Sequence, residues 1–157
     1  MINFLVRIAT AKDSKDIFEW RNDKFTREMS NETKIINWEE HKNWFNKSLN
    51  SKKCILLICE ESSFNKIALI RFDILNIGAV ISINLNPIER GKNLSKQCLI
   101  KSIIFFSNSS PFTKELYAEV KENNIASNKL FVGVGFYKYK VYKNIVCYKK
   151  NLRTIDN

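Results

Sequence analysis

The segment Leu85–Leu99 reads L-N-P-I-E-R-G-K-N-L-S-K-Q-C-L and carries the clearest structural signal in the chain. An apolar strand ends at Pro87, and the turn Arg90-Gly91-Lys92 leads directly into a helical pattern. Such a strand–turn–helix aims main-chain N–H groups and the positive end of the helix at one point. Because the turn also carries two cations, it predicts a diphosphate site. An ordinary β-to-α turn that uses Gly for tightness is the alternative.

A second segment, Val120–Phe136, reads V-K-E-N-N-I-A-S-N-K-L-F-V-G-V-G-F. It continues a predicted strand over Glu115–Val120, and its apolar spacing predicts a short helix over Asn124–Val132. The chain therefore contains two strand–helix units that follow one another, which is typical of a βαβ crossover.

The remaining segments are predicted from their apolar periodicity and from Gly and polar breaks. At the N-terminal end, the sequence predicts a strand over Asn3–Ala9, a helix over Asp13–Asp23, an irregular stretch over Phe25–Lys34 and a helix from Asn37, whose spacing to Glu40 suits a capping box. Further strands are expected over Cys54–Glu60, Lys66–Ile74, Ala79–Leu85, Phe136–Lys143 and Asn144–Lys150, and a further helix over Asn93–Ser107. This order predicts one α+β domain over residues 1–157, with an antiparallel meander followed by the crossover.

Together, the two segments resemble the GCN5-related N-acetyltransferase (GNAT) superfamily. In that family a strand–R-G-x-G-x-G/A–helix element holds the diphosphate of coenzyme A, and N-x-x-S/A-x-x-L-Y/F-x-x-x-G-F follows it. The matching positions are Arg90-Gly91-Lys92-Asn93-Leu94-Ser95 in the first motif and Asn124, Ser127, Leu130, Phe131, Gly135 and Phe136 in the second. The resemblance covers the whole chain. It implies the GNAT fold, a mixed and mostly antiparallel sheet of about seven strands with about four helices and splayed central parallel strands.

The resemblance implies acetyl-CoA as co-substrate and a coenzyme site on three segments. Main-chain N–H groups near Asn84 and Leu85 are expected to polarise the thioester carbonyl. The coenzyme-binding residues that it implies are Ile83, Asn84, Leu85, Arg90, Gly91, Lys92, Asn93, Leu94, Ser95, Asn124, Ser127 and Phe131.

Three positions depart from the family pattern. Asn93 replaces a Gly, but Asn tolerates a positive φ better than most residues. Ser95 is small enough for close approach of a phosphate, although it can crowd that site. Phe131 stands where many members carry a Tyr that protonates the leaving thiolate, and Phe has no proton to donate. The acid is then Tyr137, Ser127 or a water, or the thiolate leaves without one.

The N-terminal sequence predicts the acceptor. The pattern W-R-N-x-x-x-x-R over Trp20–Arg27, followed by E-H-x-x-W-F over Glu40–Phe45, resembles one acetyltransferase branch. Its bacterial members acetylate the 4-amino group of nucleotide-linked deoxy-amino sugars in the pseudaminic and legionaminic acid pathways. Enzymes that acetylate the N-termini of ribosomal proteins are less similar. The expected acceptor-binding residues are Arg21, Asn22, Arg27, His41, Arg71 and Asp73.

Simpler interpretations of these residues remain open. Arg21 and Arg27 suit solvated charges on a helix and a loop, and His41 suits a packed core residue on an apolar stripe. Two positions are expected to be catalytic, Asn124 through the family motif and Glu119 as the base that deprotonates the acceptor amine. Asp73 is the other candidate base, and Glu119 also suits an outward-facing strand residue.

Two alternative functions follow from the same motifs. One is an N-acetyltransferase that acts on a protein or peptide. The other is a non-catalytic acyl-CoA-binding module that keeps the fold but lacks the acid at Phe131. We expect a small-molecule amine as partner, and we leave a homodimer open.

The amino-acid composition narrows the classes of partner that the chain can bind. Lys and Arg number 26 against 16 acidic residues, which gives a formal charge of +10. That charge suits an anionic small molecule, and the absence of an Arg-rich patch argues against nucleic acid. No stretch approaches the ~20 apolar residues that span a bilayer, so no membrane partner is expected. No leader pattern precedes the first strand, which suggests the cytoplasm.

The cysteines and the histidine argue against a metal site. Cys54, Cys59, Cys98 and Cys147 form no C-x-x-C pair, and the chain has one His. The first three cysteines lie in apolar runs, so they are expected to be buried thiols.

Overall fold

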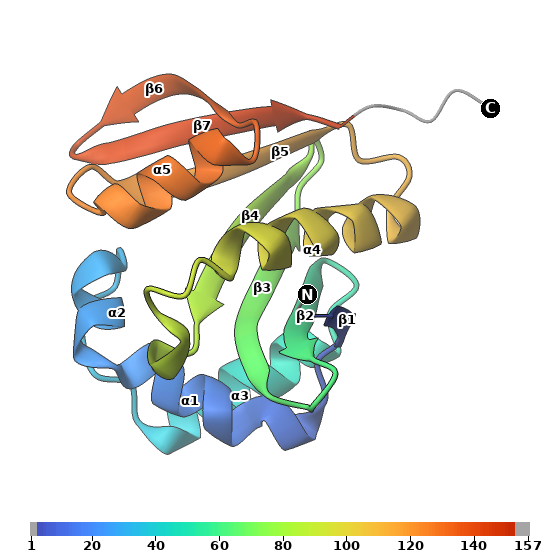
Figure 1. Ribbon diagram of the computed structural model, residues 1–157, viewed down its shortest axis with the longest axis vertical. Coiled ribbons are helices and arrows are strands. Elements are labelled where there is room, and N and C mark those ends of the chain that lie inside the picture. Colours follow the sequence, from blue (N-terminus) through green and yellow to red (C-terminus); the bar gives the residue numbers. More distant parts are fainter. Residues whose placement is uncertain (1–2, 153–157) are drawn as a thin grey trace.

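The computed structural model describes residues 3–152, which form one seven-stranded sheet with helices on both faces (Figure 1). The strand order is β1-β2-β3-β4-β5-β7-β6. The strands are β1 (Phe4–Ile8), β2 (Cys54–Glu61), β3 (Lys66–Ile74), β4 (Ala79–Leu85), β5 (Glu115–Lys121), β6 (Tyr137–Tyr142) and β7 (Ile145–Asn151). Neighbours are antiparallel except β4 and β5, which are parallel. The predicted mixed sheet is therefore confirmed.

Seven helical segments connect these strands in the described part of the chain. They are the 3-10 helix η1 (Ala11–Asp13), α1 (Ser14–Asn22), α2 (Lys24–Met29), α3 (Trp38–Leu49), the 3-10 helix η2 (Pro87–Glu89), α4 (Ser95–Ser109) and α5 (Ile125–Gly133). None of these helices is long and apolar enough to cross a membrane.

Apolar side chains on both faces of the central strands explain the layers. Successive strand residues point to opposite faces. Leu57 and Ile70 lie in the larger core with residues of α4 and α5, whereas Leu56 and Ile58 lie in a second core with residues of α1 and α3. A helix layer therefore covers each face, as Figure 1 shows.

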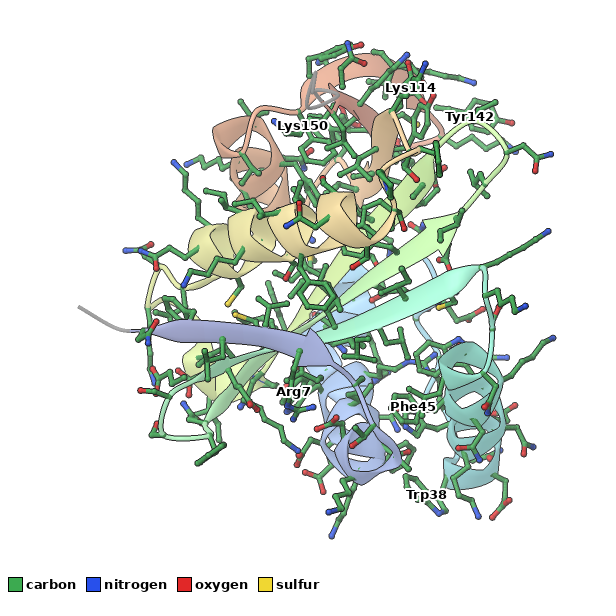
Figure 2. The ribbon with its side chains drawn as sticks, turned by 90° about the vertical axis from the view of Figure 1, so that its right-hand side faces the viewer. Arg7, Trp38, Phe45, Lys114, Tyr142 and Lys150 are labelled. Atoms are coloured by element: carbon green, nitrogen blue, oxygen red, sulfur yellow. The ribbon has the colours of Figure 1, made fainter. Side chains whose placement is uncertain are left out.

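The amino acids before and along α3 explain its start and its orientation. The Asn37 side chain accepts a hydrogen bond from the Glu40 N–H at 2.9 Å, and the Glu40 carboxylate accepts one from the Asn37 N–H at 3.3 Å. This is the predicted capping box. His41 and Phe45, four residues apart, are both fully buried, and Figure 2 shows Phe45 on the side of α3 that faces α1.

The parallel pair β4–β5 opens after a short contact. Its register contains only Ala79 opposite Leu116 and Val80 opposite Tyr117, although β4 continues to Leu85. At the closed end, a Cβ on Gly78 would lie 2.5 Å from the Glu115 carbonyl oxygen, so only Gly permits this approach. The two strands are thus held at one end and separate towards the other.

The structure corrects one predicted segment. Phe25–Lys34 was expected to be irregular, but α2 occupies its first part. The Asp23 side chain caps α2 by accepting from the Thr26 N–H at 3.0 Å. None of the α2 residues is buried, so the sequence there lacks the apolar period from which a helix is predicted.

Smaller differences have equally local causes. α4 begins at Ser95 rather than Asn93, because Asn93 adopts a φ of 58° that no helix contains. Cys59 and Cys98 are buried as predicted, whereas Cys54 is only half-buried.

Candidate active site

The turn between β4 and α4 presents a row of free main-chain donors. Gly91 has a φ of 76° and Asn93 a φ of 58°, so two residues of this turn adopt the left-handed conformation before the helix. Among the described residues, no group accepts a hydrogen bond from the N–H groups of positions 91–97. A Cβ on Gly91 would meet no atom within 4 Å, so the space in front of the turn is open. This arrangement can hold an anion.

The two cations predicted at this turn are already paired. Arg90 donates to Thr26 Oγ1 at 2.8 Å and also to the Asp23 carboxylate. Lys92 Nζ lies 2.9 Å from Glu89 Oε2. Hydrogen bonds from Asn65 and Lys92 lower the pKa of Glu89, so this buried acid is ionised. The side chains of Arg90 and Lys92 therefore add less free positive charge than the sequence suggests.

Two lysines that the sequence analysis did not single out face the same space. Lys96 lies in the first turn of α4 and Lys129 lies on α5, and both line the cavity in front of the turn. Within residues 3–152, neither ammonium is within ion-pair distance of a carboxylate. Because the motif pattern contains no Lys at either position, only the fold brings them to the turn.

The opening between β4 and β5 exposes main-chain groups of β4. The Asn86 N–H donates to the Ile67 carbonyl at 2.8 Å, which fixes the direction of alternate residues. Since N–H groups of successive strand residues point to opposite edges, those of Ile83 and Leu85 face the opening. By the same alternation, the Asn84 N–H faces β3. Of the two residues expected to polarise the thioester carbonyl, Leu85 thus directs its N–H to the opening and Asn84 directs its N–H to β3.

α5 faces the opening from the β5 side and is fixed by two asparagines. Asn124 accepts from the Ser127 N–H at 3.2 Å and so caps the helix. Asn128, which the sequence analysis missed, donates to the Lys121 carbonyl at 2.9 Å and accepts from the Tyr148 hydroxyl at 2.7 Å. The predicted catalytic position Asn124 thus has a structural contact of its own.

Phe131 is a core residue at the edge of the opening. Its side chain is 3% exposed, and its ring lies edge-on to Phe136 with centroids 5.1 Å apart. Ser127 lies one turn earlier on α5, on the side of the helix that lines the larger cavity. Hence a hydroxyl is present beside the opening, although it is not on residue 131.

Two adjoining cavities occupy this region. The larger has a volume of about 810 Å³ and lies between the turn, the end of β4, α2 and α5. The smaller, of about 240 Å³, lies in the opening between β4 and β5 and contains Glu119 in its lining. The residues common to both are Met29, Ser30, Ile83, Asn124 and Ser127. In Figure 1, α5 lies above α2, and both lie to the left of the end of β4.

The predicted acceptor residues Arg21 and His41 belong to an aromatic cluster beside this region. The Arg21 guanidinium lies 4.1 Å from the centroid of the Trp44 ring, and that of Arg71 lies 5.3 Å from it. Burial lowers the pKa of Arg21, and the nearby Arg71 lowers it further. Burial also lowers the pKa of His41, whose Nε2 donates to the Ser14 carbonyl at 2.8 Å. His41 is therefore a neutral, packed residue.

Arg71 and Asp73 form an ion pair on β3. Arg71 Nε lies 2.9 Å from Asp73 Oδ2, and both side chains are about one-third exposed. Arg71 lies opposite Ser82 of β4, and Ser82 lines the smaller cavity. Arg71 itself lines neither cavity, and it and Asp73 are already paired with each other.

Asn22 and Arg27 bind the chain that follows α2. Asn22 donates to the Ile36 carbonyl at 2.8 Å and accepts from the Ile36 N–H at 2.9 Å. Arg27 donates to the carbonyls of Asn22 at 3.1 Å and Thr33 at 3.0 Å. Neither residue lines the two cavities. Their contacts shape the loop and do not bring them to the predicted acceptor side.

The described residues contain no group of three His, Cys, Asp or Glu placed to hold a metal ion. The polar groups that line the two cavities include main-chain donors, lysines, hydroxyls and Glu119.

Comparisons with known proteins match this geometry. The sequence profile described as an acetyltransferase (GNAT) domain matches residues 6–157. A solved domain from Methanocaldococcus jannaschii superposes with a TM-score of 0.81 at 23% identity, covering 97% of this chain and 100% of that one. The spermidine N-acetyltransferase of Vibrio cholerae, solved with CoA and spermine, superposes with a TM-score of 0.83 at 16% identity, covering 94% and 95%. The GNAT fold expected from the sequence is thereby confirmed.

One curated relative extends well beyond this chain. An uncharacterised protein of Methanocaldococcus jannaschii is 26% identical over 142 residues, which are 87% of this chain. The chain spans 28% of the length of that relative.

Proposed function

The chain belongs to the GNAT family of acetyltransferases, and we propose that it transfers the acetyl group of acetyl-CoA to a primary amine. We propose further that the acceptor is the 4-amino group of a nucleotide-linked deoxy-amino sugar. The observation that carries the reaction is the cavity of about 810 Å³ that joins the anion-holding turn to the opening between β4 and β5. An extended molecule with a diphosphate at one end and a thioester at the other suits this shape.

The diphosphate of acetyl-CoA would lie on the N–H groups of positions 91–97. Their free donors and the end of α4 attract negative charge, and Lys96 and Lys129 add two flexible cations at the rim. Because Gly91 has no side chain, phosphate oxygens can approach its backbone closely. The residues present thus fit the co-substrate without a contribution from the Arg90 guanidinium.

The pantetheine arm would extend along the free edge of β4. Ile83 and Leu85 turn their main-chain groups towards β5 where the two strands have separated. An amide-containing arm can pair with such an edge as another strand would. An N–H of this edge that donates to the thioester carbonyl stabilises the negative charge that develops on its oxygen during attack.

Transfer then needs one nucleophilic substitution. The lone pair of the amine nitrogen attacks the thioester carbon, the C–N bond forms, and the C–S bond breaks to release the thiolate. The nitrogen loses one proton, for which Glu119 in the smaller cavity is the proposed acceptor. The thiolate gains one, from Ser127 or from water, because Phe131 carries none.

Positive charge in the aromatic cluster outside the two cavities favours an anionic acceptor over a polyamine. Two guanidinium groups, those of Arg21 and Arg71, lie against Trp44, and only Arg71 has a carboxylate partner in the described chain. Partly exposed guanidinium groups of this kind, packed on an aromatic ring, suit the phosphates of a sugar nucleotide. These guanidinium groups would repel a polycation.

The test is a panel of amines with acetyl-CoA, followed by thiol release and by mass spectrometry of the acceptor. The panel contains a UDP-linked 4-amino-4,6-dideoxy sugar, spermidine, and a peptide with a free N-terminus. We expect the sugar nucleotide to give the highest kcat/KM. Preference for spermidine or the peptide would overturn the acceptor class, and acetyl-CoA binding without turnover on any amine would support the non-catalytic module instead.

Replacing Glu119 by Gln is expected to lower kcat/KM by about 10- to 100-fold, within or below the ~10²- to 10⁴-fold that a general base typically contributes. The effect stays moderate because positioning alone supplies much of the acceleration, and an amine on a deoxy-sugar ring is already partly neutral near pH 7. The pH–rate profile of the variant should follow the pKa of the acceptor amine.

Glu115→Gln is the matched control for this prediction. Glu115 lies on the same strand but outside both cavities, where it pairs with Lys149 at 2.8 Å. Its replacement should leave kcat/KM nearly unchanged. Full activity and an unaltered pH profile in Glu119→Gln would assign the proton to Asp73 or to water.

A further inference from the structure

We propose that the Arg90–Asp23 ion pair is a strut that couples the coenzyme-binding turn to α2, which makes Asp23 a positioning residue for the acceptor. The inference rests on the proposed function in one respect, namely that the turn binds the diphosphate of CoA. It adds that occupation of the turn fixes the position of α2, which lines both cavities, so that CoA on the turn and amine in the opening favour each other's binding.

The contacts of Arg90 connect two segments that are far apart in the sequence. Its Nη2 donates to the Asp23 carboxylate and, at 2.8 Å, to Thr26 Oγ1. The guanidinium also lies 5.0 Å from the centroid of the Phe25 ring. The hydrogen bond from Arg90 lowers the pKa of Asp23, so the pair is charged at neutral pH. Every polar contact of this guanidinium is thus made to the start of α2.

Asp23 performs two tasks at once. One is the ion pair with Arg90, and the other is the cap of α2, through the bond from the Thr26 N–H at 3.0 Å. The side chains of Asp23 and Arg90 are 25% and 32% exposed, so water screens the pair only partly. The first turn of α2 is therefore fixed to the residue that immediately precedes Gly91.

Polar contacts, rather than a buried apolar face, determine where α2 lies. None of its six residues is buried. Besides the Arg90 contacts, Lys121 at the end of β5 donates to the Glu28 carbonyl at 3.0 Å. A helix with so little apolar burial has a low local stability, and its position responds to small changes at its contacts.

α2 also forms part of both cavities. Phe25 and Thr26 line the larger cavity, while Met29 and Ser30 line the larger and the smaller one, where Glu119 lies. A change in the position of α2 consequently changes the space beside the proposed base. Because binding at one site and order at another are thermodynamically linked, CoA on the turn and amine in the opening assist each other through this strut.

The first experiment measures amide hydrogen exchange over residues 24–30 with and without CoA, which needs no acceptor. In the wild type, CoA is expected to slow exchange in this segment by about fivefold or more. In Asp23→Asn the slowing should disappear, although α2 should persist because Asn caps a helix as well as Asp does. Asp23→Ala removes cap and ion pair together and should also raise the exchange rate without CoA.

Glu28→Gln is the matched control, since it removes one acidic charge from the same helix at a side chain that is 54% exposed. It should retain the wild-type protection. Equal protection by CoA in the wild type and in Asp23→Asn would overturn the strut while leaving the proposed function intact. Failure of CoA to bind the wild type, seen as no thermal shift, would overturn both.

The second experiment separates positioning from general instability by steady-state kinetics. With saturating acetyl-CoA and the UDP-linked 4-amino sugar, Asp23→Asn should raise the acceptor KM by about fivefold or more. The change in kcat should be smaller, because Asp23 lies outside both cavities and does not reach the reacting atoms. An unchanged acceptor KM in Asp23→Asn, with or without a fall in kcat, would contradict the proposal.

Discussion

Replacing Asp13 by Asn is expected to lower the free energy of unfolding by about 3 kcal/mol, the low end of the range for breaking a buried ion pair. The Asp13 carboxylate is 1% exposed, and it accepts hydrogen bonds from Arg7 at 2.8 and 2.9 Å and from the Thr10 N–H at 2.8 Å. Lys66 Nζ lies 2.9 Å away. The neutral amide would leave two cations without their common partner. Arg7, labelled in Figure 2, is about one-third exposed and keeps its ion pair with Glu60 at 3.1 Å, which limits the loss.

Asp16→Asn is the matched control for this loss. Asp16 also binds Lys66, at 2.7 Å, but its side chain is 45% exposed. An exposed pair of this kind contributes about 0–1 kcal/mol. The free energies of unfolding of the two variants, measured in urea, should therefore differ clearly, and their m-values should be the same as that of the wild type. Equal losses would mean that burial of the carboxylate is not what gives the Asp13 pairs their strength.

The pH dependence of stability has a definite sign here. Burial by itself raises the pKa of Asp13, but the hydrogen bonds from Arg7, Thr10 and Lys66 outweigh it and hold the pKa well below its ordinary value. In the unfolded chain the pKa of this carboxyl group is about 3.9. The contribution of Asp13 is therefore fully present above that pH and decreases as the pH falls below it. The stability difference between wild type and Asp13→Asn should shrink correspondingly in acid.

The sequence predicted most of the fold because its strands are apolar on both faces and its breaks are polar or Gly. Cys54–Glu60 and Lys66–Ile74 show this clearly, and they match β2 and β3 closely. α2 was missed because it buries none of its residues, so its sequence contains no period to detect. Its single local signal is Asp23 as a cap, which a loop also accommodates.

The site was predictable as far as it depends on the main chain. Gly91 and Asn93 are residue types that adopt a positive φ, and both do. The side-chain contacts were not predictable, because they join segments distant in sequence. The sequence predicts that Arg90 faces a phosphate, but Arg90 contacts Asp23, and Lys96 and Lys129 line the cavity without a carboxylate partner in residues 3–152. Such pairing depends on where α2 lies, which the sequence did not indicate.

Replacing Gly91 by Val is expected to weaken acetyl-CoA binding by at least about 1.4 kcal/mol, which is a tenfold rise in Kd. Gly91 has a φ of 76°, and a Cβ there would meet no atom within 4 Å. The free protein therefore has room for the Val side chain, but a Val residue does not readily adopt this φ. A β-branched residue disfavours positive φ by roughly 1–2 kcal/mol or more, so the turn should rotate and lose the alignment of its free N–H groups.

Gly91→Asn separates conformation from bulk in this prediction. Asn also adds a side chain, but it adopts a positive φ far more readily than Val. Calorimetric titration with acetyl-CoA should therefore rank the affinities as Gly, then Asn, then Val. Equal losses in both variants would assign the effect to obstruction of the phosphate by any side chain. An unchanged Kd in a folded Gly91→Val protein would place the diphosphate elsewhere.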